Sequence, residues 1–221
     1  MRRGDGLAET VLLGVALLSL AVSAGGTLLA AAVGVPLGAL LGSREFRGRR
    51  LLRAFLQALY GLPPVLLGLL LYLTLSRTGP LGGLHWLFTV QGMVLAQFLL
   101  ATPFVMGLSW SAVAGIDGAV KDTARTLGAE RWTYLFTLVR EARAGIFAAV
   151  MVGFGRAISE VGAVIMVGGN IQGETEVLTT AIVKETGRGD FALAVGLGLV
   201  LLALSVLVFA GLTLLQEGEH R

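Results

Sequence analysis

Five long apolar stretches limit what this sequence can fold into. They cover residues 11–41, 51–75, 90–113, 146–167 and 191–215. A helix that crosses a bilayer needs about 20 predominantly apolar residues, and each stretch is that long. Because backbone polar groups find no water in the hydrocarbon core, such stretches must be helical. The sequence therefore predicts an all-α, polytopic membrane protein with five transmembrane helices, in which residues 1–221 form a single transmembrane domain.

The composition argues against a water-soluble globule. The chain is 55% hydrophobic and 14% charged, whereas soluble domains carry about 25% charged residues. Its 32 glycines suit close helix packing in lipid, or they reflect a general bias toward Gly, Ala and Arg. The net charge of +3 comes from arginines that cluster beside apolar stretches. This pattern favours membrane topology over nucleic-acid binding, and we expect no nucleic-acid partner.

Two apolar stretches carry local irregularities. The second contains Pro63-Pro64, which must kink or break its helix because proline removes a backbone donor and clashes with the preceding turn. The first is longer than one perpendicular crossing requires, so we expect it to tilt or to begin at the membrane interface.

The distribution of Lys and Arg between the loops predicts the orientation. Loops 76–89 and 168–190 hold one and two basic residues, whereas the two loops of opposite parity hold five each. These ten are Arg44, Arg47, Arg49, Arg50, Arg53, Lys121, Arg125, Arg131, Arg140 and Arg143. Five spans then place both basic loops and the C-terminus in the cytoplasm and the N-terminus outside.

Residues 117–143 form a polar, helix-prone segment between two apolar stretches. Asp117 is a suitable N-cap, and Gly128 can end the helix that follows because glycine accepts a left-handed conformation. A second helix is predicted by an apolar stripe with helical spacing, formed by Trp132, Leu135, Phe136 and Val139. The segment is either an amphipathic connector or a surface for a soluble partner.

Several segments of the chain, which together cover most of residues 19–191, resemble ABC importer permeases. Asp122-Thr123-Ala124, followed after three residues by Gly128, resembles the EAA-x-x-x-G loop of that family. Here Asp replaces the Glu and Thr the first Ala, and the downstream I-x-L-P is missing at residues 138–141. GRAISEVGAVIMVGGNI resembles the fourth helix of the molybdate/tungstate/sulfate branch. The continuation, ETEVLTTAIVKETGRGDF, is most similar to tungstate-type permeases.

The resemblance implies a function and a set of partners. It implies a type I, MetI-like permease of the prokaryotic inner membrane, with residues 117–143 as a cytoplasmic two-helix coupling loop. The expected cargo is a tetrahedral oxyanion, tungstate first and molybdate next, with sulfate left open. The expected partners are cytoplasmic ABC ATPases, an extracytoplasmic oxyanion-binding protein and a second copy of the permease. The coupling residues would be Asp122, Thr123, Ala124, Leu127 and Gly128.

The subunit itself is expected to have no catalytic site, cofactor or metal. The sequence lacks G-x-x-x-x-G-K-[ST], the loop that cradles nucleotide phosphates, so we expect ATP hydrolysis on a separate chain. His85 and His220 are the only histidines and have no metal-ligand spacing. A secondary carrier is the alternative, although that class needs its own coupling-ion site and usually has inverted repeats.

Arg156 and Glu160 stand out because they lie four residues apart inside the fourth apolar stretch. An isolated Arg in a membrane helix costs about 2.5–3.5 kcal/mol, and this spacing places both side chains on one helix face. With Ser159, they are candidates for the translocation path or for a gate. We favour a charge pair that clips helices together or holds a gate, because a conduit should not trap its cargo.

Two further groups of polar residues remain open. Loop 168–190 contains a helix-like stretch at residues 177–184, which either receives a binding protein, covers the pore or packs as a surface segment. In the third stretch, the polar side chains either bond to neighbouring helices or line a polar route. They are Gln91, Gln97, Thr102, Ser109 and Ser111.

Overall fold

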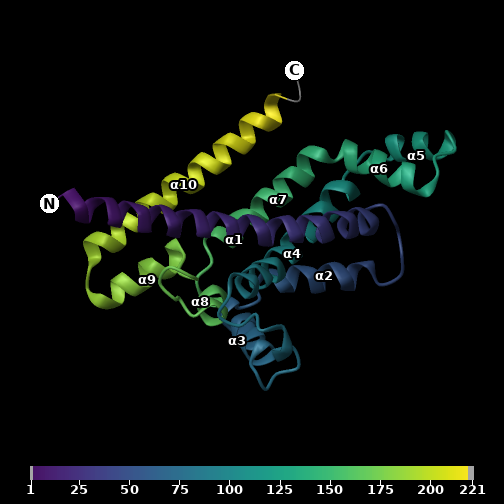
Figure 1. The fold of residues 1–221 in the computed structure, drawn as a ribbon. Coiled ribbons are helices and arrows are strands. Elements are labelled where there is room, and N and C mark those ends of the chain that lie inside the picture. Colours follow the sequence, from purple (N-terminus) through teal and green to yellow (C-terminus); the bar gives the residue numbers. More distant parts are fainter. Residues whose placement is uncertain (1, 219–221) are drawn as a thin grey trace. The chain divides into compact units, whose positions relative to one another are not determined.

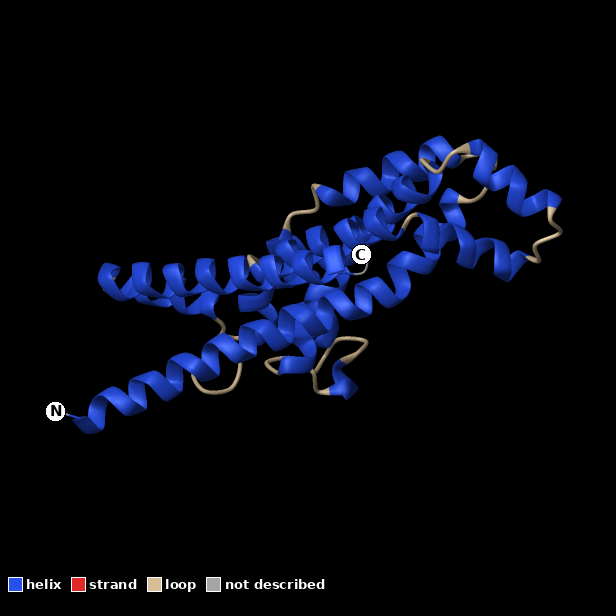
Figure 2. Ribbon diagram, turned by 90° about the horizontal axis from the view of Figure 1, so that it is seen from above, coloured by secondary structure: helices blue, strands red, loops and turns tan. Residues whose placement is uncertain are grey.

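The computed structural model describes residues 2–218, and every regular element in that range is a helix (Figures 1 and 2). In chain order the elements are α1 (Arg2–Gly42), α2 (Arg49–Tyr60), α3 (Pro64–Leu75), the 3-10 helix η1 (Gly82–Leu84), α4 (Val90–Ala114), α5 (Gly118–Thr126), α6 (Arg131–Glu141), α7 (Arg143–Ile158), α8 (Gly162–Gly168), α9 (Leu178–Arg188) and α10 (Phe191–Gly218).

The predicted all-α membrane architecture is confirmed. Helices α1, α4 and α10 are each long and apolar enough to cross a membrane, and the number of candidate spans rises to five if the broken pairs α2–α3 and α7–α8 each count as one. The first helix begins at Arg2, well before the predicted start at residue 11. Residues 117–143 contain the two predicted short helices, α5 and α6.

The two helix breaks have different origins. The break between α2 and α3 lies at the predicted position, and Pro64 is the first residue of α3, where its missing N–H is harmless. The break between α7 and α8 was not predicted, because the fourth apolar stretch was expected to form one helix. It occurs without a proline at residues 159–161. Glu160 stabilises it by accepting a hydrogen bond from the Ala163 amide at the start of α8.

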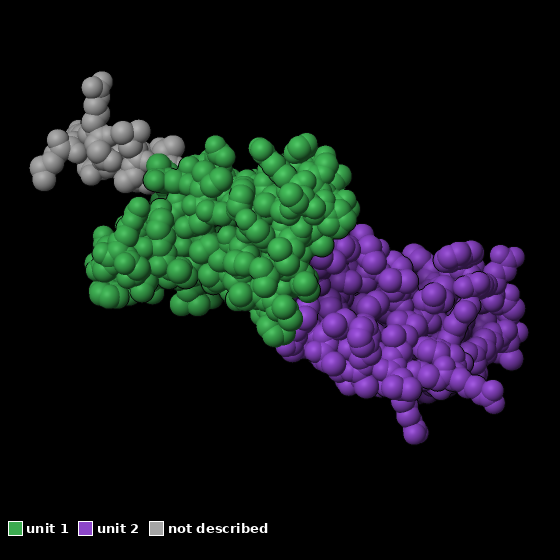
Figure 3. All heavy atoms as spheres, turned by 90° about the horizontal axis from the view of Figure 1, so that it is seen from below, with its two compact units in different colours: residues 1–26, 63–97, 155–221 green, residues 27–62, 98–154 purple. Residues whose placement is uncertain are grey.

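The chain divides into two compact units, coloured separately in Figure 3. Unit 1 comprises residues 1–26, 63–97 and 155–221, and unit 2 comprises residues 27–62 and 98–154. Helices α1, α4 and α7 each contribute residues to both units. The organisation as one transmembrane domain stays a prediction.

Unit 1 is held together by apolar clusters and by one close helix contact. Val22, Met93, Val164 and Val177 form one buried cluster, and a second surrounds Leu178. Helix α3 packs on α8 so closely that a Cβ added at Gly68 would lie 2.8 Å from the Ala163 Cα. Small residues permit such backbone approach between membrane helices.

Unit 2 has a core that anchors the polar segment. Leu138 of α6 is fully buried in a cluster with Ala39, Val113, Ala142 and Ile146. In contrast, α5 buries none of its residues. Helix α6 therefore fixes the polar segment to unit 2, while α5 stays open to the surroundings.

Candidate functional site

Helix α5 is defined by local signals at both ends. The Asp117 carboxylate accepts a hydrogen bond from the Ala119 amide at 3.0 Å, which confirms the predicted N-cap. The helix ends at Thr126, and Gly128 follows with a φ of 73°, a conformation in which glycine carries no Cβ penalty. The Lys121 ammonium also donates to the Ala114 carbonyl at 2.9 Å. These contacts orient α5 relative to the end of α4.

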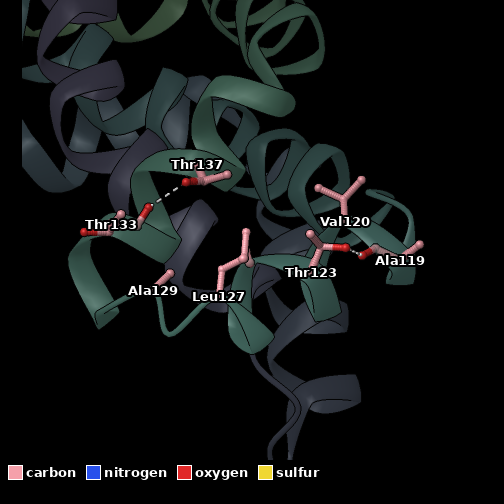
Figure 4. A pocket seen from close by; sticks show the side chains of 8 residues that line it. Ala119, Val120, Thr123, Leu127, Ala129, Thr133 and Thr137 are labelled. Carbon is pink, nitrogen blue, oxygen red and sulfur yellow. Dashed lines mark hydrogen bonds between the residues drawn. The ribbon is translucent and has the colours of Figure 1, made fainter.

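An apolar hollow of about 570 Å³ lies between α5 and α6 (Figure 4). Its lining consists of small and apolar side chains with three threonines, namely Ala119, Val120, Thr123, Ala124, Leu127, Ala129, Thr133 and Thr137. The Thr123 and Thr137 hydroxyls donate to carbonyls of their own helices, Ala119 and Thr133. Their hydrogen-bonding capacity is thus largely used internally, and the hollow presents methyl groups.

Leu127 is the most exposed apolar side chain of this hollow. It lies between the α5 and α6 sides in Figure 4 and is 81% exposed. Single exposed leucines are ordinary, but Leu127 belongs to a polar, charged segment and lines a concave surface. Such a combination suits occupation by another protein's side chain.

The five predicted coupling residues do not all share this hollow. Thr123, Ala124 and Leu127 line it, whereas Asp122 lines a neighbouring hollow with Lys121 and Arg125. The Asp122 carboxylate lies 3.7 Å from the Arg125 guanidinium, and both are exposed. A Cβ added at Gly128 would meet open space. Gly128 therefore serves to form the turn and does not pack against a neighbouring residue.

The apolar stripe predicted on α6 faces the core only in part, because Val139 packs against the buried cluster while Trp132 and Phe136 do not. Trp132 and Phe136 are 77% and 70% exposed, and with Leu135 and Val139 they line a hollow of about 590 Å³ beside the end of α1. The core-facing residue is Leu138, in a row with Tyr134 and Ala142. These three residues are spaced four apart, so helical periodicity in the sequence could have predicted that they share one face of the helix.

Arg156 and Glu160 form an ion pair at the break between α7 and α8. The Arg156 Nη1 lies 2.7 Å from the Glu160 Oε2, and their side chains are 28% and 3% exposed. The expectation that both residues lie on one helix face is wrong, because α7 ends at Ile158 and Glu160 belongs to the break. The pair still forms because Arg156 lies in the last turn of α7 and Glu160 follows two residues after the helix ends.

Glu160 is held from three sides. Its Oε2 contacts Arg156, its Oε1 accepts from the Ala163 amide at 3.0 Å, and its backbone carbonyl accepts from the Thr179 hydroxyl at 2.8 Å. The Gln97 amide group donates to the carbonyl of Ala157 at 2.8 Å. Side chains from α4, α7 and α9 thus satisfy the backbone and carboxylate groups around this break, as buried polar groups require.

Ser159 does not join this network. Its hydroxyl donates to the Gly155 carbonyl at 2.8 Å, within its own helical turn, and the residue is exposed. Of the three predicted residues, the structure thus brings together Arg156 and Glu160. Thr179 was missed because it lies in a different segment. Gln97 was recognised only as one of several polar residues of the third stretch.

A second set of charges lies on α9 and before it. The Lys184 ammonium pairs with the buried Glu176 carboxylate and lies 3.4 Å from Glu185, which Arg188 contacts at 2.9 Å. Helix α9 buries Leu178 and Thr180. It extends beyond the predicted stretch 177–184 and is packed against α10. Loop 168–190 is therefore in large part structured, with residues 175–181 buried in unit 1 and residues 171–174 and 186–190 exposed.

Comparison with known proteins assigns the chain to one family. The model of the family described as binding-protein-dependent transport system inner membrane component matches residues 34–218. The chain is 42% identical over 200 residues to the tungstate uptake system permease protein of Peptoclostridium acidaminophilum, covering 90% of this chain and 88% of that protein. It is 33% identical over 161 residues to the corresponding protein of Campylobacter jejuni, with coverages of 73% and 67%.

A related protein is named for a different cargo. The molybdenum transport system permease protein of Escherichia coli strain K12 is 34% identical over 174 residues, which cover 75% of this chain and 76% of that protein. The residues that the family model matches, 34–218, include both α5 and the break at Glu160.

Proposed function

Since the chain belongs to the family of binding-protein-dependent transport system inner membrane components, we propose that it is the membrane-spanning subunit of an ATP-driven importer for a tetrahedral oxyanion, tungstate first and molybdate next. The observation that carries this proposal is the 42% identity to a tungstate uptake permease across 90% of the chain. The tungstate-type segment 174–191, read from the sequence, supports the same cargo.

The proposed subunit acts with separate proteins. ATP hydrolysis resides on cytoplasmic ATPase subunits, an extracytoplasmic protein delivers the anion, and two copies of this chain form the path. The exposed apolar side chains of α10, among them Leu199, Leu202 and Leu207, support burial in lipid or against a second copy. The orientation places the C-terminus in the cytoplasm, on the basis of the arginine-rich loops.

We place the ATPase contact on α5 and the turn after it. Three observations support this assignment: α5 buries none of its residues, Leu127 is 81% exposed, and an apolar hollow adjoins it. A helix that contacts α6 on one side and buries none of its own residues can seat in a cleft of a partner. Asp122 and Arg125 then form a polar rim beside the apolar contact, as interfaces commonly have.

We assign Arg156 and Glu160 to a gate. Both carboxylate oxygens of Glu160 are engaged by protein groups, and the Arg156 charge is neutralised by that carboxylate. A neutralised guanidinium attracts a dianion only weakly, so the pair suits a hinge element better than a resting site for cargo. Opening of the path would then change the angle at the α7–α8 break.

The cargo assignment is tested by reconstituting the permease with its ATPase and binding protein in vesicles. Tungstate, molybdate and sulfate are each supplied with the binding protein, and ATP hydrolysis and anion uptake are measured together. We expect tungstate to stimulate both at the lowest concentration. Equal stimulation by sulfate would overturn the cargo assignment, and uptake without ATP would overturn the ATP-driven mechanism in favour of a secondary carrier.

A further inference from the structure

A polar hollow of about 870 Å³ in unit 2 lies where the α1–α2 connection meets α2. Figure 1 shows α2 running back from this connection in the direction opposite to α1. Arg49, Arg50 and Arg53 line the hollow, with Glu45 as the acidic member and Ser111 of α4 opposite. Neither α5 nor the Arg156–Glu160 pair contributes to it, so the proposed function does not account for it.

Aromatic and ionic contacts fix the walls of the hollow. The Phe46 and Trp110 rings stack with centroids 6.4 Å apart, and Trp110 is buried. The Arg49 guanidinium lies over the Trp110 ring at 5.9 Å and pairs with the Glu45 carboxylate. Arg49 and Glu45 thus neutralise each other and hold the connection in place.

Two positive charges are left over. Among the residues that the structure describes, no carboxylate pairs with Arg50 or Arg53, and both residues are exposed. Arg53 donates from its Nη2 to the Ser111 hydroxyl at 3.1 Å, which orients the guanidinium without neutralising it. An arginine fork held in this way retains further N–H donors in the fixed plane that suits oxyanions.

The start of α2 adds to the positive potential. Helix α2 is twelve residues long and has Gly48 as its N-cap, with a φ of 90° and no side chain to cap it. The first amides of a helix lack intrahelical partners and carry partial positive charge, although the first amide of α2, that of Arg49, already donates to the Phe46 carbonyl at 3.3 Å. Gly48 and Leu51 line the same hollow as the arginines, so this helix end and both free guanidinium groups adjoin one space.

We propose that this hollow binds a tetrahedral oxyanion of phosphate geometry, with Arg50 and Arg53 as its charged ligands. Two sources have this chemistry at a membrane surface, namely the phosphodiester headgroup of an anionic lipid and free phosphate. Exposed Leu51 and Phe55 on α2 place apolar side chains beside the charges, as in helices that lie at a lipid interface. The site does not depend on the identity of the transported anion.

The first test uses the unmodified full-length chain. The protein is placed in nanodiscs of phosphatidylcholine, alone, with inorganic phosphate, or with phosphatidylglycerol in the disc, and is labelled with phenylglyoxal. Mass spectrometry of peptides then reads the labelling rate at Arg50 and Arg53, with Arg44 and Arg47 as internal controls. We expect at least a fivefold slower rate at Arg50 and Arg53 and less than a twofold change at the controls.

The arms of this experiment separate the two sources. Protection by phosphatidylglycerol alone assigns the site to a lipid headgroup, and protection by inorganic phosphate in neutral discs assigns it to a free oxyanion. If neither probe slows the labelling of Arg50 and Arg53, the proposal is wrong. It is equally wrong if all four arginines are slowed to the same extent, because diffuse screening then explains the effect.

A second test compares two variants of equal charge. R50Q/R53Q removes both ligands, and R44Q/R47Q removes two arginines of the same connection that do not line the hollow. A basic residue at an anionic lipid surface contributes about fivefold in affinity, so we expect R50Q/R53Q to retain about 25-fold less phosphatidylglycerol or phosphate, whichever protected the arginines, in native mass spectrometry. Equal losses in both variants would overturn the site. Should R50Q/R53Q not fold, the labelling of the unmodified chain decides.

Discussion

The Glu160 carboxylate joins the end of α7 to the start of α8, with Oε2 2.7 Å from the Arg156 guanidinium and Oε1 3.0 Å from the Ala163 amide. The two contacts are made by different oxygens of one buried group. A single side chain thus both neutralises a charge in an apolar region and satisfies a helix end. Changes at Arg156 and at Glu160 should therefore have unequal effects.

Replacing Arg156 by Gln should destabilise the protein more than replacing Glu160 by Gln. R156Q leaves a carboxylate that is 3% exposed without its partner, and breaking such a pair costs about 3 kcal/mol when one member is partly exposed, or roughly 6–12 °C in Tm. E160Q keeps an oxygen for the Ala163 amide, and the partly exposed Arg156 can reach polar surroundings, so we expect a loss of about 1 kcal/mol. Thermal unfolding of the purified variants measures both.

The double variant R156Q/E160Q provides the control for this prediction. It contains no buried charge and should be more stable than R156Q alone, while anion uptake stays reduced in all three variants. Strictly additive losses of stability would show that the two side chains do not act as a pair. Normal uptake by R156Q would contradict the assignment to a gate.

Thr179→Val should destabilise unit 1, because it removes the hydroxyl that donates to the Glu160 carbonyl at 2.8 Å. The carbonyl is then left without this donor in a buried site, at a cost of about 1–3 kcal/mol. Thr186→Val on the same helix is the matched control, because Thr186 is exposed and its hydroxyl bonds to its own helix at Ile182. Equal Tm values for the two variants would contradict the role of Thr179.

Gly68→Ala should force α3 and α8 apart. The added Cβ would lie 2.8 Å from the Ala163 Cα and 2.9 Å from the Met166 Cβ, and overpacking of this kind costs about 1–3 kcal/mol. Gly196→Ala on α10 meets nothing within 4 Å and should be neutral or stabilising by up to about 1 kcal/mol, because alanine favours the helix. A Tm for Gly68→Ala at or above that of Gly196→Ala would refute the close contact.

Thr123→Glu should weaken the association with the ATPase, because it places a charge in the apolar hollow beside Leu127. Thr126→Glu is the control, since Thr126 lies on the same short helix, is exposed and bonds to its own helix, but does not line the hollow. We expect on the order of tenfold less ATPase to co-purify with Thr123→Glu, and near-normal amounts with Thr126→Glu. If both variants retain the ATPase equally, the contact does not lie on this face of α5.

Much of the fold could be predicted from sequence because membrane helices are recognisable by their length and apolar composition. The proline pair fixed the position of the α2–α3 break, and Asp117 and Gly128 marked the ends of the segment containing α5. The α7–α8 break could not be predicted in this way. No proline marks it, and besides the local contacts of Glu160 it is stabilised by Thr179 and Gln97, which are distant in sequence.

The sequence predicted which residues form the candidate sites better than it predicted the backbone geometry of those sites. The charges of Arg156 and Glu160 are conspicuous in an apolar stretch, so their pairing could be foreseen, but the backbone between them could not. On α6, the stripe that includes Trp132 and Phe136 predicts the helix, and the structure buries Leu138 in the core instead of these two rings. Which residues of α6 are buried depends on packing against Ala39, Val113 and Ile146 of other helices, which the sequence of α6 does not contain.

The hydroxyl of Ser19 donates to the Val15 carbonyl and accepts from the Leu178 amide at 2.8 Å. One atom near the beginning of the chain thus completes its bonding only with a residue near the end. During synthesis, the first helix enters the bilayer long before Leu178 leaves the ribosome. Biogenesis of this protein therefore includes an interval in which α1 is inserted but Ser19 does not yet have the hydrogen bond from Leu178.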